Sequence, residues 1–141
     1  MPDTGCIVAA VCSWHEHHGR AIDEIQSRLK KKQTVVVAAH SLIEAYAVLT
    51  RLPPPHRISA KDACTVLQAN FVKNVKTIAL SPSAYPSLLD FASSAGISGA
   101  RVYDALIAAT ARQARAQTLV TFNASRFEGL AGEDLQIAVP E

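Results

Sequence analysis

The chain has 141 residues, of which 49% are hydrophobic and 18% are charged, and its formal net charge is +2. This composition indicates one globular domain with a single core, covering residues 1–141, and excludes a disordered chain. The opening segment lacks a basic leader with a cleavage site, and no apolar run approaches the roughly 20 residues of a membrane helix, so we expect a cytoplasmic protein without membrane contact.

Hydrophobic periodicity predicts helices that alternate with short strands. Helices are expected at 21–30, 40–52, 59–73, 82–96 and 101–115. Strands are expected at 34–39, 76–80, 118–122 and 135–139. This alternation indicates an α/β fold, with a central parallel sheet flanked by helices on both faces. Because ligands bind beyond the carboxyl ends of such strands, functional residues should follow strands or open helices.

One acid, Asp104, stands in an otherwise apolar stretch of a predicted helix. At helical spacing it shares a face with Ile107, Ala108 and Ala111. An unpaired carboxylate is costly to bury, so Asp104 needs a partner. A bland first-turn role, or pairing with Arg101 three residues earlier, would require a solvated position, which the apolar neighbours disfavour.

Three further polar residues occupy comparable places in the predicted order of elements. Glu44 comes soon after the first predicted strand, where Ser41 and Glu44 also have the spacing of a helix capping box. Asp3 precedes an apolar run and has a helix N-cap as its alternative role. Asn123 follows the third predicted strand, where its alternative role is that of a turn residue.

Oxygen ligands that follow different strands of one sheet converge on one crevice. Clustered carboxylates repel each other, and a hard divalent cation is the natural group to hold them together. Ligand sets without Cys or His favour Mg²⁺ or Mn²⁺ over zinc. A metal held in this way activates water and neutralises charge on phosphate oxygens during phosphodiester hydrolysis. The pattern therefore predicts a metal-dependent phosphodiesterase.

Four segments follow each other along the chain: DTGCIVAAV, AHSLIEAYAVLTRLPPPHR, GISGARVYDALIAATAR and LVTFNASRF. In this order they resemble the characteristic segments of PIN-domain proteins, which are small metal-dependent ribonucleases. The size and single-domain layout are most similar to the toxins of VapBC-type toxin–antitoxin systems. The resemblance implies metal ligation by Asp3, Glu44 and Asp104, and it adds Asn123 to the catalytic set.

The resemblance also implies an activity and partners. The activity is endonucleolytic cleavage of RNA by metal-activated water, with Mg²⁺ or Mn²⁺ as cofactor, leaving a 5′-phosphate and a 3′-hydroxyl. The partners are the RNA substrate, a cognate antitoxin whose C-terminal segment covers the acidic crevice, and a second copy in a homodimer. A catalytically weak PIN-fold binding module and an RNA-processing nuclease are the alternatives.

Four other residues are placed near the predicted site. Arg101 and Arg126 flank it and are candidates for phosphate contact, and Arg126 stands where some PIN-domain proteins carry another acid. His40 lies one helical turn before Glu44, and Thr121 lies shortly before Asn123, so both are candidates to orient groups at the site. Only two residues precede Asp3, so either a first strand ahead of it is very short or the true start of the chain lies upstream.

The remaining potential metal ligands do not have the spacing of a metal site. The histidines of WHEHH, residues 14–18, lie in a polar stretch between two helices without a second ligand cluster, so we expect solvated loop residues close to the RNA path. The cysteines are odd in number and form no CxxC pair, which argues against a disulfide framework and a zinc site.

Overall fold

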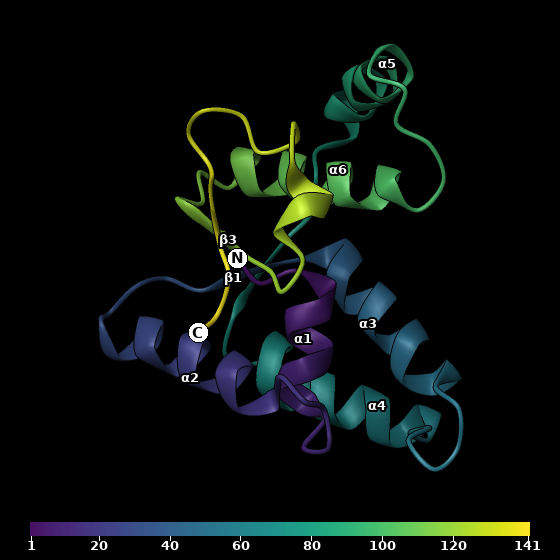
Figure 1. Cartoon of the computed structure of the whole chain (residues 1–141), viewed down its shortest axis with the longest axis vertical. Coiled ribbons are helices and arrows are strands. Elements are labelled where there is room, and N and C mark those ends of the chain that lie inside the picture. The colour runs from purple at the N-terminus through teal and green to yellow at the C-terminus, as the bar shows by residue number, and fades with distance from the viewer.

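Helices lie on both sides of four short parallel strands in the computed structural model, which describes residues 1–141 (Figure 1). The strands are β1 (Val36–Ala38), β2 (Lys76–Ile78), β3 (Thr118–Val120) and β4 (Gln136–Ala138). β1 pairs with β2 and β3 pairs with β4, and both pairs are parallel. The predicted α/β fold is therefore confirmed, although the expected central sheet consists of two two-stranded ladders.

The six helices are α1 (Thr4–Val11), α2 (His18–Lys30), α3 (Ala39–Arg51), α4 (Ala60–Leu67), α5 (Tyr85–Ser94) and α6 (Arg101–Gln113). Five of the six helices lie close to their predicted positions, and α1 is additional to the predicted ones. Local sequence signals explain where several helices begin and end. The Ser59 hydroxyl caps the start of α4 by accepting a hydrogen bond from the Asp62 amide at 3.1 Å. α3 ends just ahead of the prolines at 53–55. The helix expected to reach residue 73 continues instead as a π-helical turn, η1 (Gln68–Val72).

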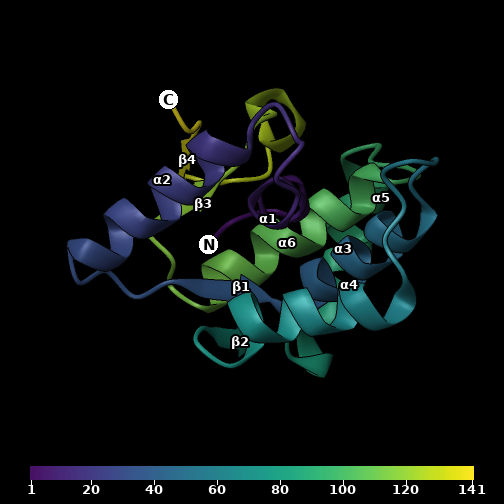
Figure 2. The same ribbon diagram turned by 90° about the horizontal axis from the view of Figure 1, so that it is seen from below.

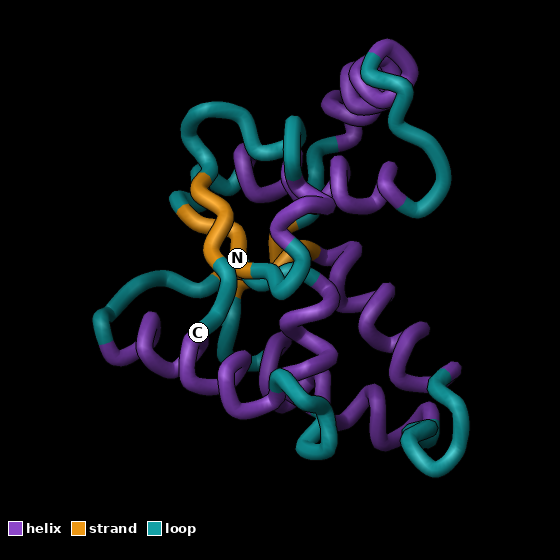
Figure 3. Tube along the Cα trace, viewed as in Figure 1, coloured by secondary structure: helices purple, strands orange, loops and turns teal.

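The strands separate two hydrophobic clusters. Neighbouring residues of a strand point to opposite faces, and accordingly Val37 belongs to one cluster and Ala38 to the other. The Val37 cluster includes residues of α1, α3 and α4, and the Ala38 cluster includes residues of α6 and β3. Figure 3 shows the strands between these two groups of helices, so both faces are covered as expected.

The N-terminal residues attach directly to β3. Pro2 forms an isolated parallel bridge with Val120, the Val120 amide donates to the Met1 carbonyl at 2.8 Å, and the Asp3 amide donates to the Val120 carbonyl at 2.9 Å. This confirms a very short first strand and fixes Asp3 at the carboxyl end of β3. From there α1 runs between α2 and α3 (Figures 1 and 2). None of the helices combines the length and the hydropathy that crossing a membrane requires.

Candidate active site

The three acids predicted as metal ligands come from three elements and line one pocket of about 240 Å³. Asp3 immediately precedes α1, Glu44 lies in the second turn of α3, and Asp104 lies in the first turn of α6. The other polar or aromatic lining residues are Thr4, His15, Phe122, Asn123 and Arg126. The fold thus brings together residues that are about one hundred positions apart in the sequence.

Asp3 is both a helix cap and a member of the pocket. Its Oδ1 accepts a hydrogen bond from the Cys6 amide at 2.7 Å, so the N-cap alternative is confirmed. Asp3 is only 9% exposed, and burial raises the pKa of its carboxyl. The Thr121 hydroxyl, the Cys6 amide and the Arg126 charge favour the ionised form and act against this increase.

Glu44 does not take part in a capping box. α3 begins at Ala39, its N-cap residue Ala38 has no side-chain hydrogen bond, and the buried Ser41 hydroxyl has no partner. Because the helix begins before Ser41, this residue lies inside the first turn and cannot act as the cap, so the capping-box interpretation is wrong. Glu44 Oε2 instead accepts from the Thr4 hydroxyl at 2.5 Å.

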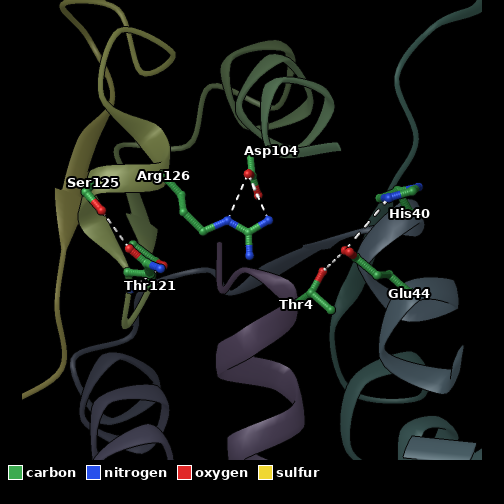
Figure 4. Close-up of polar contacts among 8 residues, drawn as sticks. Thr4, His40, Glu44, Asp104, Thr121, Ser125 and Arg126 are labelled. Atoms are coloured by element: carbon green, nitrogen blue, oxygen red, sulfur yellow. Dashed lines mark hydrogen bonds and ion pairs between the residues drawn. The ribbon is translucent and has the colours of Figure 1, made fainter. Parts of the chain in front are cut away.

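Asp104 faces Arg126, which extends from the 3₁₀ turn η3 (Ala124–Phe127) toward α6 (Figure 4). The Nε and a terminal nitrogen of Arg126 both lie 2.9 Å from Asp104 Oδ2. Asp104 is 5% exposed, whereas 47% of the Arg126 side chain is exposed. Arg101 does not pair with Asp104, because its guanidinium donates to the Glu128 carbonyl at 3.0 Å.

The environment of Asp104 disfavours its negative charge despite the arginine. Burial raises the pKa of its carboxyl, the contacts with Arg126 lower it, and the charges of Glu44 and Asp3 raise it further. The net direction is upward. The three carboxylates are therefore close enough across the pocket for the charges of Glu44 and Asp3 to raise the pKa of Asp104.

The donor set fits a hard divalent cation in its chemistry. Hydrogen bonds engage one oxygen each of Glu44 and Asp104, and neither Oε1 of Glu44 nor Oδ1 of Asp104 has a protein partner. Carboxylate oxygens that repel one another are the ligands that Mg²⁺ and Mn²⁺ accept. The carboxylates do not form a compact ligand cluster in this structure, where Glu44 is bonded to Thr4 and Asp104 to Arg126.

The other predicted site residues are divided between the pocket and its surroundings. Asn123 lines the pocket, and its Oδ1 accepts from the Ser125 hydroxyl at 2.8 Å. Thr121 is fully buried, and its Oγ1 accepts from the Asn123 amide at 3.0 Å. His40 Nε2 lies 3.8 Å from Glu44 Oε2, and the His40 ring stacks on Tyr103 with the centroids 4.8 Å apart.

Sequence reasoning missed three residues of the pocket. Thr4 holds Glu44, and its position directly after Asp3 was the available signal. His15 was expected as a solvated loop residue, yet it lines the pocket, and burial lowers the pKa of its imidazole. Phe122 falls within the strand expected at 118–122, but β3 ends at Val120, and no sequence signal indicates that Phe122 lies in the pocket wall.

Similarity to known proteins identifies the family. The profile of the PIN domain matches residues 1–133. The chain is 36% identical over 118 residues to Ribonuclease VapC40 of Mycobacterium tuberculosis. These aligned residues cover 84% of this chain and 82% of that protein.

Two solved structures share the fold. VapC20 of Mycobacterium tuberculosis, described as a sarcin-ricin loop cleaving toxin, aligns with a TM-score of 0.69 at 17% identity over 91% of this chain and 92% of that one. VapBC2 of Rickettsia felis, solved bound to a DNA fragment from its promoter, aligns with a TM-score of 0.71 at 21% identity over 100% and 98% of the two chains. The profile match and the identity to a ribonuclease show that the chain belongs to the PIN-domain family, whose ribonucleases generally depend on divalent metal ions.

Proposed function

We propose that the chain is the toxin of a VapBC-type toxin–antitoxin system, an endoribonuclease that hydrolyses RNA with Mg²⁺ or Mn²⁺ held by Asp3, Glu44 and Asp104. The observation that carries the proposal is the convergence of these three acids on one pocket from three separate elements. The ribonuclease name of the relative that is 36% identical supports RNA as the substrate.

The chain's own residues hold and orient the groups at the site. The Cys6 amide fixes Asp3, and the Thr4 hydroxyl fixes Glu44. When bound, a divalent cation supplies Lewis acidity that activates water and neutralises charge on the phosphate. Asn123 presents an exposed amide at the pocket wall for hydrogen bonding to substrate or water. Arg126 supplies a half-exposed positive charge close to where the phosphate must lie.

Protein partners belong to the same proposal. The toxin would bind a cognate antitoxin that covers the acidic pocket, and it would form a homodimer. A VapBC assembly among the structural neighbours supports the antitoxin. Large apolar side chains exposed on α5 supply a surface for protein contact, with Leu89 63% and Phe91 38% exposed.

The first test is calorimetric titration of the metal-free protein with Mn²⁺, for the wild type and for Asp104→Asn. We expect binding by the wild type and loss of binding in the variant, followed by Mn²⁺-dependent RNA cleavage by the wild type alone. The matched control is Asp90→Asn, because Asp90 is an exposed acid of α5 that does not line the pocket. This control should bind and cleave like the wild type.

One observation favours the alternative of a catalytically weak PIN-fold module. The ion pair between Arg126 and Asp104 occupies a candidate ligand with a charge of the protein's own. Absence of both Mn²⁺ binding and cleavage in the wild type, at millimolar metal and neutral pH, would favour this module and contradict the proposed nuclease.

A further inference from the structure

A row of ring side chains extends from the candidate active pocket along the loop between α1 and α2. Phe122 lines the pocket and stacks on His17, with centroids 4.4 Å apart and an interplanar angle of 29°. The His17 ring lies 5.4 Å from that of His15, which also lines the pocket, and His15 lies 6.0 Å from Trp14. Trp14 stacks on His56 at 4.1 Å. We call these five residues the ring row.

The outer part of the ring row is open to solvent. Trp14 is the only tryptophan of the chain, and 44% of it is exposed although His56 stacks against its ring. Large aromatic side chains are usually more deeply buried, and tryptophan is enriched at binding interfaces, so an exposed indole beside a pocket is available for contact with a ligand. The WHEHH segment holds no metal cluster, so its rings have no ligand role that would account for this arrangement.

The Arg20 side chain places a positive charge at the end of the ring row that is closest to the pocket. The Arg20 guanidinium carbon lies 5.2 Å from the centroid of the Phe122 ring, and a terminal nitrogen of Arg20 lies 2.7 Å from His17 Nδ1. Burial and the neighbouring imidazoles of His17 and His18 lower the pKa of His15. A neutral imidazole presents a flat surface for stacking, while Arg20 supplies the positive charge that attracts phosphate.

We propose that the ring row is a base-stacking ledge that guides single-stranded RNA into the acidic pocket. Every base has a π-face, and proteins that bind single strands combine aromatic platforms with a positive charge along the backbone. The row satisfies both requirements and is continuous with the pocket through Phe122 and His15. The bases of a double helix are already stacked and cannot use such a ledge. This inference rests on the proposed ribonuclease function.

The test uses the full chain carrying Glu44→Gln, so that RNA is bound without being cleaved. The affinity for a short single-stranded oligouridylate is measured by the anisotropy of a dye on the RNA, which every variant can report. Stacking is followed in the Glu44→Gln parent by the fluorescence of Trp14, which is the only tryptophan. We expect quenching on binding, because a base stacks on the indole, and no quenching by a duplex of the same length. Trp14→Leu should weaken binding about tenfold, the effect of losing one base stack.

Two further variants control the experiment. Trp14→Phe keeps a ring and should restore most of the affinity, which separates stacking from a general loss of folding. Tyr85→Leu removes an aromatic side chain of almost equal exposure, 43%, on α5 and away from the pocket, and should bind RNA like the parent.

The outcomes separate this inference from the function on which it rests. Binding without quenching, together with unchanged affinity in Trp14→Leu, would overturn the ledge while leaving the ribonuclease intact. Quenching by a bound partner protein, but not by RNA, would assign the row to protein contact and also overturn it. Failure of the wild type to cleave RNA and of the Glu44→Gln protein to bind it would overturn both.

Discussion

The acidic pocket has one wall on α3, which carries Glu44, and another on α6, which carries Asp104. The two walls hold their carboxylates in different ways. On the α3 wall, Glu44 accepts a hydrogen bond from the neutral hydroxyl of Thr4. On the α6 wall, Asp104 is held by the full positive charge of Arg126 (Figure 4). The first wall can receive a cation without displacing an arginine, whereas the second must exchange the Arg126 charge for that of the metal. We therefore expect the two proposed ligands to contribute unequally to metal binding.

The largest expected effect on RNA cleavage comes from removing the charge of Glu44 on the α3 wall. Glu44→Gln should lower RNA cleavage more than the roughly 10–100-fold that loss of an outer hydrogen-bond partner costs, because it removes a proposed metal ligand itself. The fold should remain, since the amide oxygen still accepts from the Thr4 hydroxyl. Cleavage assays with thermal melting check both expectations, and a variant that stays active would show that Glu44 is not a ligand.

Removing the charge that distinguishes the α6 wall sharpens the comparison. Arg126→Gln should strengthen Mn²⁺ binding by about tenfold in calorimetry, because Asp104 no longer has to release a cation first. Arg101→Gln is the matched control, since Arg101 lies nearby but donates to the Glu128 carbonyl instead. Equal affinity for the wild type and both variants would mean that Arg126 does not compete with the metal.

A smaller effect is expected from the neutral partner of Glu44. Thr4→Val removes the hydroxyl at nearly constant volume and should reduce cleavage by about fivefold, in line with the ~1 kcal/mol that one hydrogen bond contributes. Thr4→Ser keeps the donor and should restore the rate. The comparison fails if both variants lose activity equally, because packing rather than the hydrogen bond would then hold Glu44.

The smallest effect concerns stability without metal. The folded state raises the pKa of Asp104, so its ionised form opposes folding once the pH rises above the range where the unfolded carboxyl titrates. Asp104→Asn removes this penalty and should raise Tm at neutral pH by a few degrees, since each kcal/mol corresponds to roughly 2–4 °C. The difference should shrink as the pH falls and Asp104 becomes protonated. A lower Tm at neutral pH would indicate that the pair with Arg126 is a net stabiliser.

The elements and the three acids followed from sequence patterns, because these patterns report local geometry. Hydrophobic periodicity located the helices, and an acid among apolar neighbours drew attention to Asp104. The strands were predicted too long, since only three residues of each pair with a neighbour. Of the apolar residues beyond these bonds, Val35, Leu80 and Leu135 are buried through contacts that a one-dimensional pattern does not encode, whereas 48% of Val139 is exposed.

The contacts within the pocket could not be predicted in the same way. Arg126 and Asp104 are 22 positions apart, and their ion pair depends on how η3 turns back toward α6. Glu44 and Thr4 are 40 positions apart, and their contact depends on how α1 packs against α3. The capping box is a case in which a local pattern misled. Ser41 and Glu44 have the spacing of a capping box, but α3 already begins at Ala39, so Ser41 is not the N-cap residue.

The double role of Asp3 restricts which residues position 3 can tolerate. The side chain must accept the Cys6 amide to begin α1, which Asp, Asn, Ser and Thr can all do. Only Asp also brings a negative charge to the pocket in so short a side chain. Substitutions at this position therefore fall into two groups, those that keep the helix but lose the charge and those that lose both. Asp3→Asn belongs to the first group, and it separates the chemistry of the pocket from the architecture of the chain.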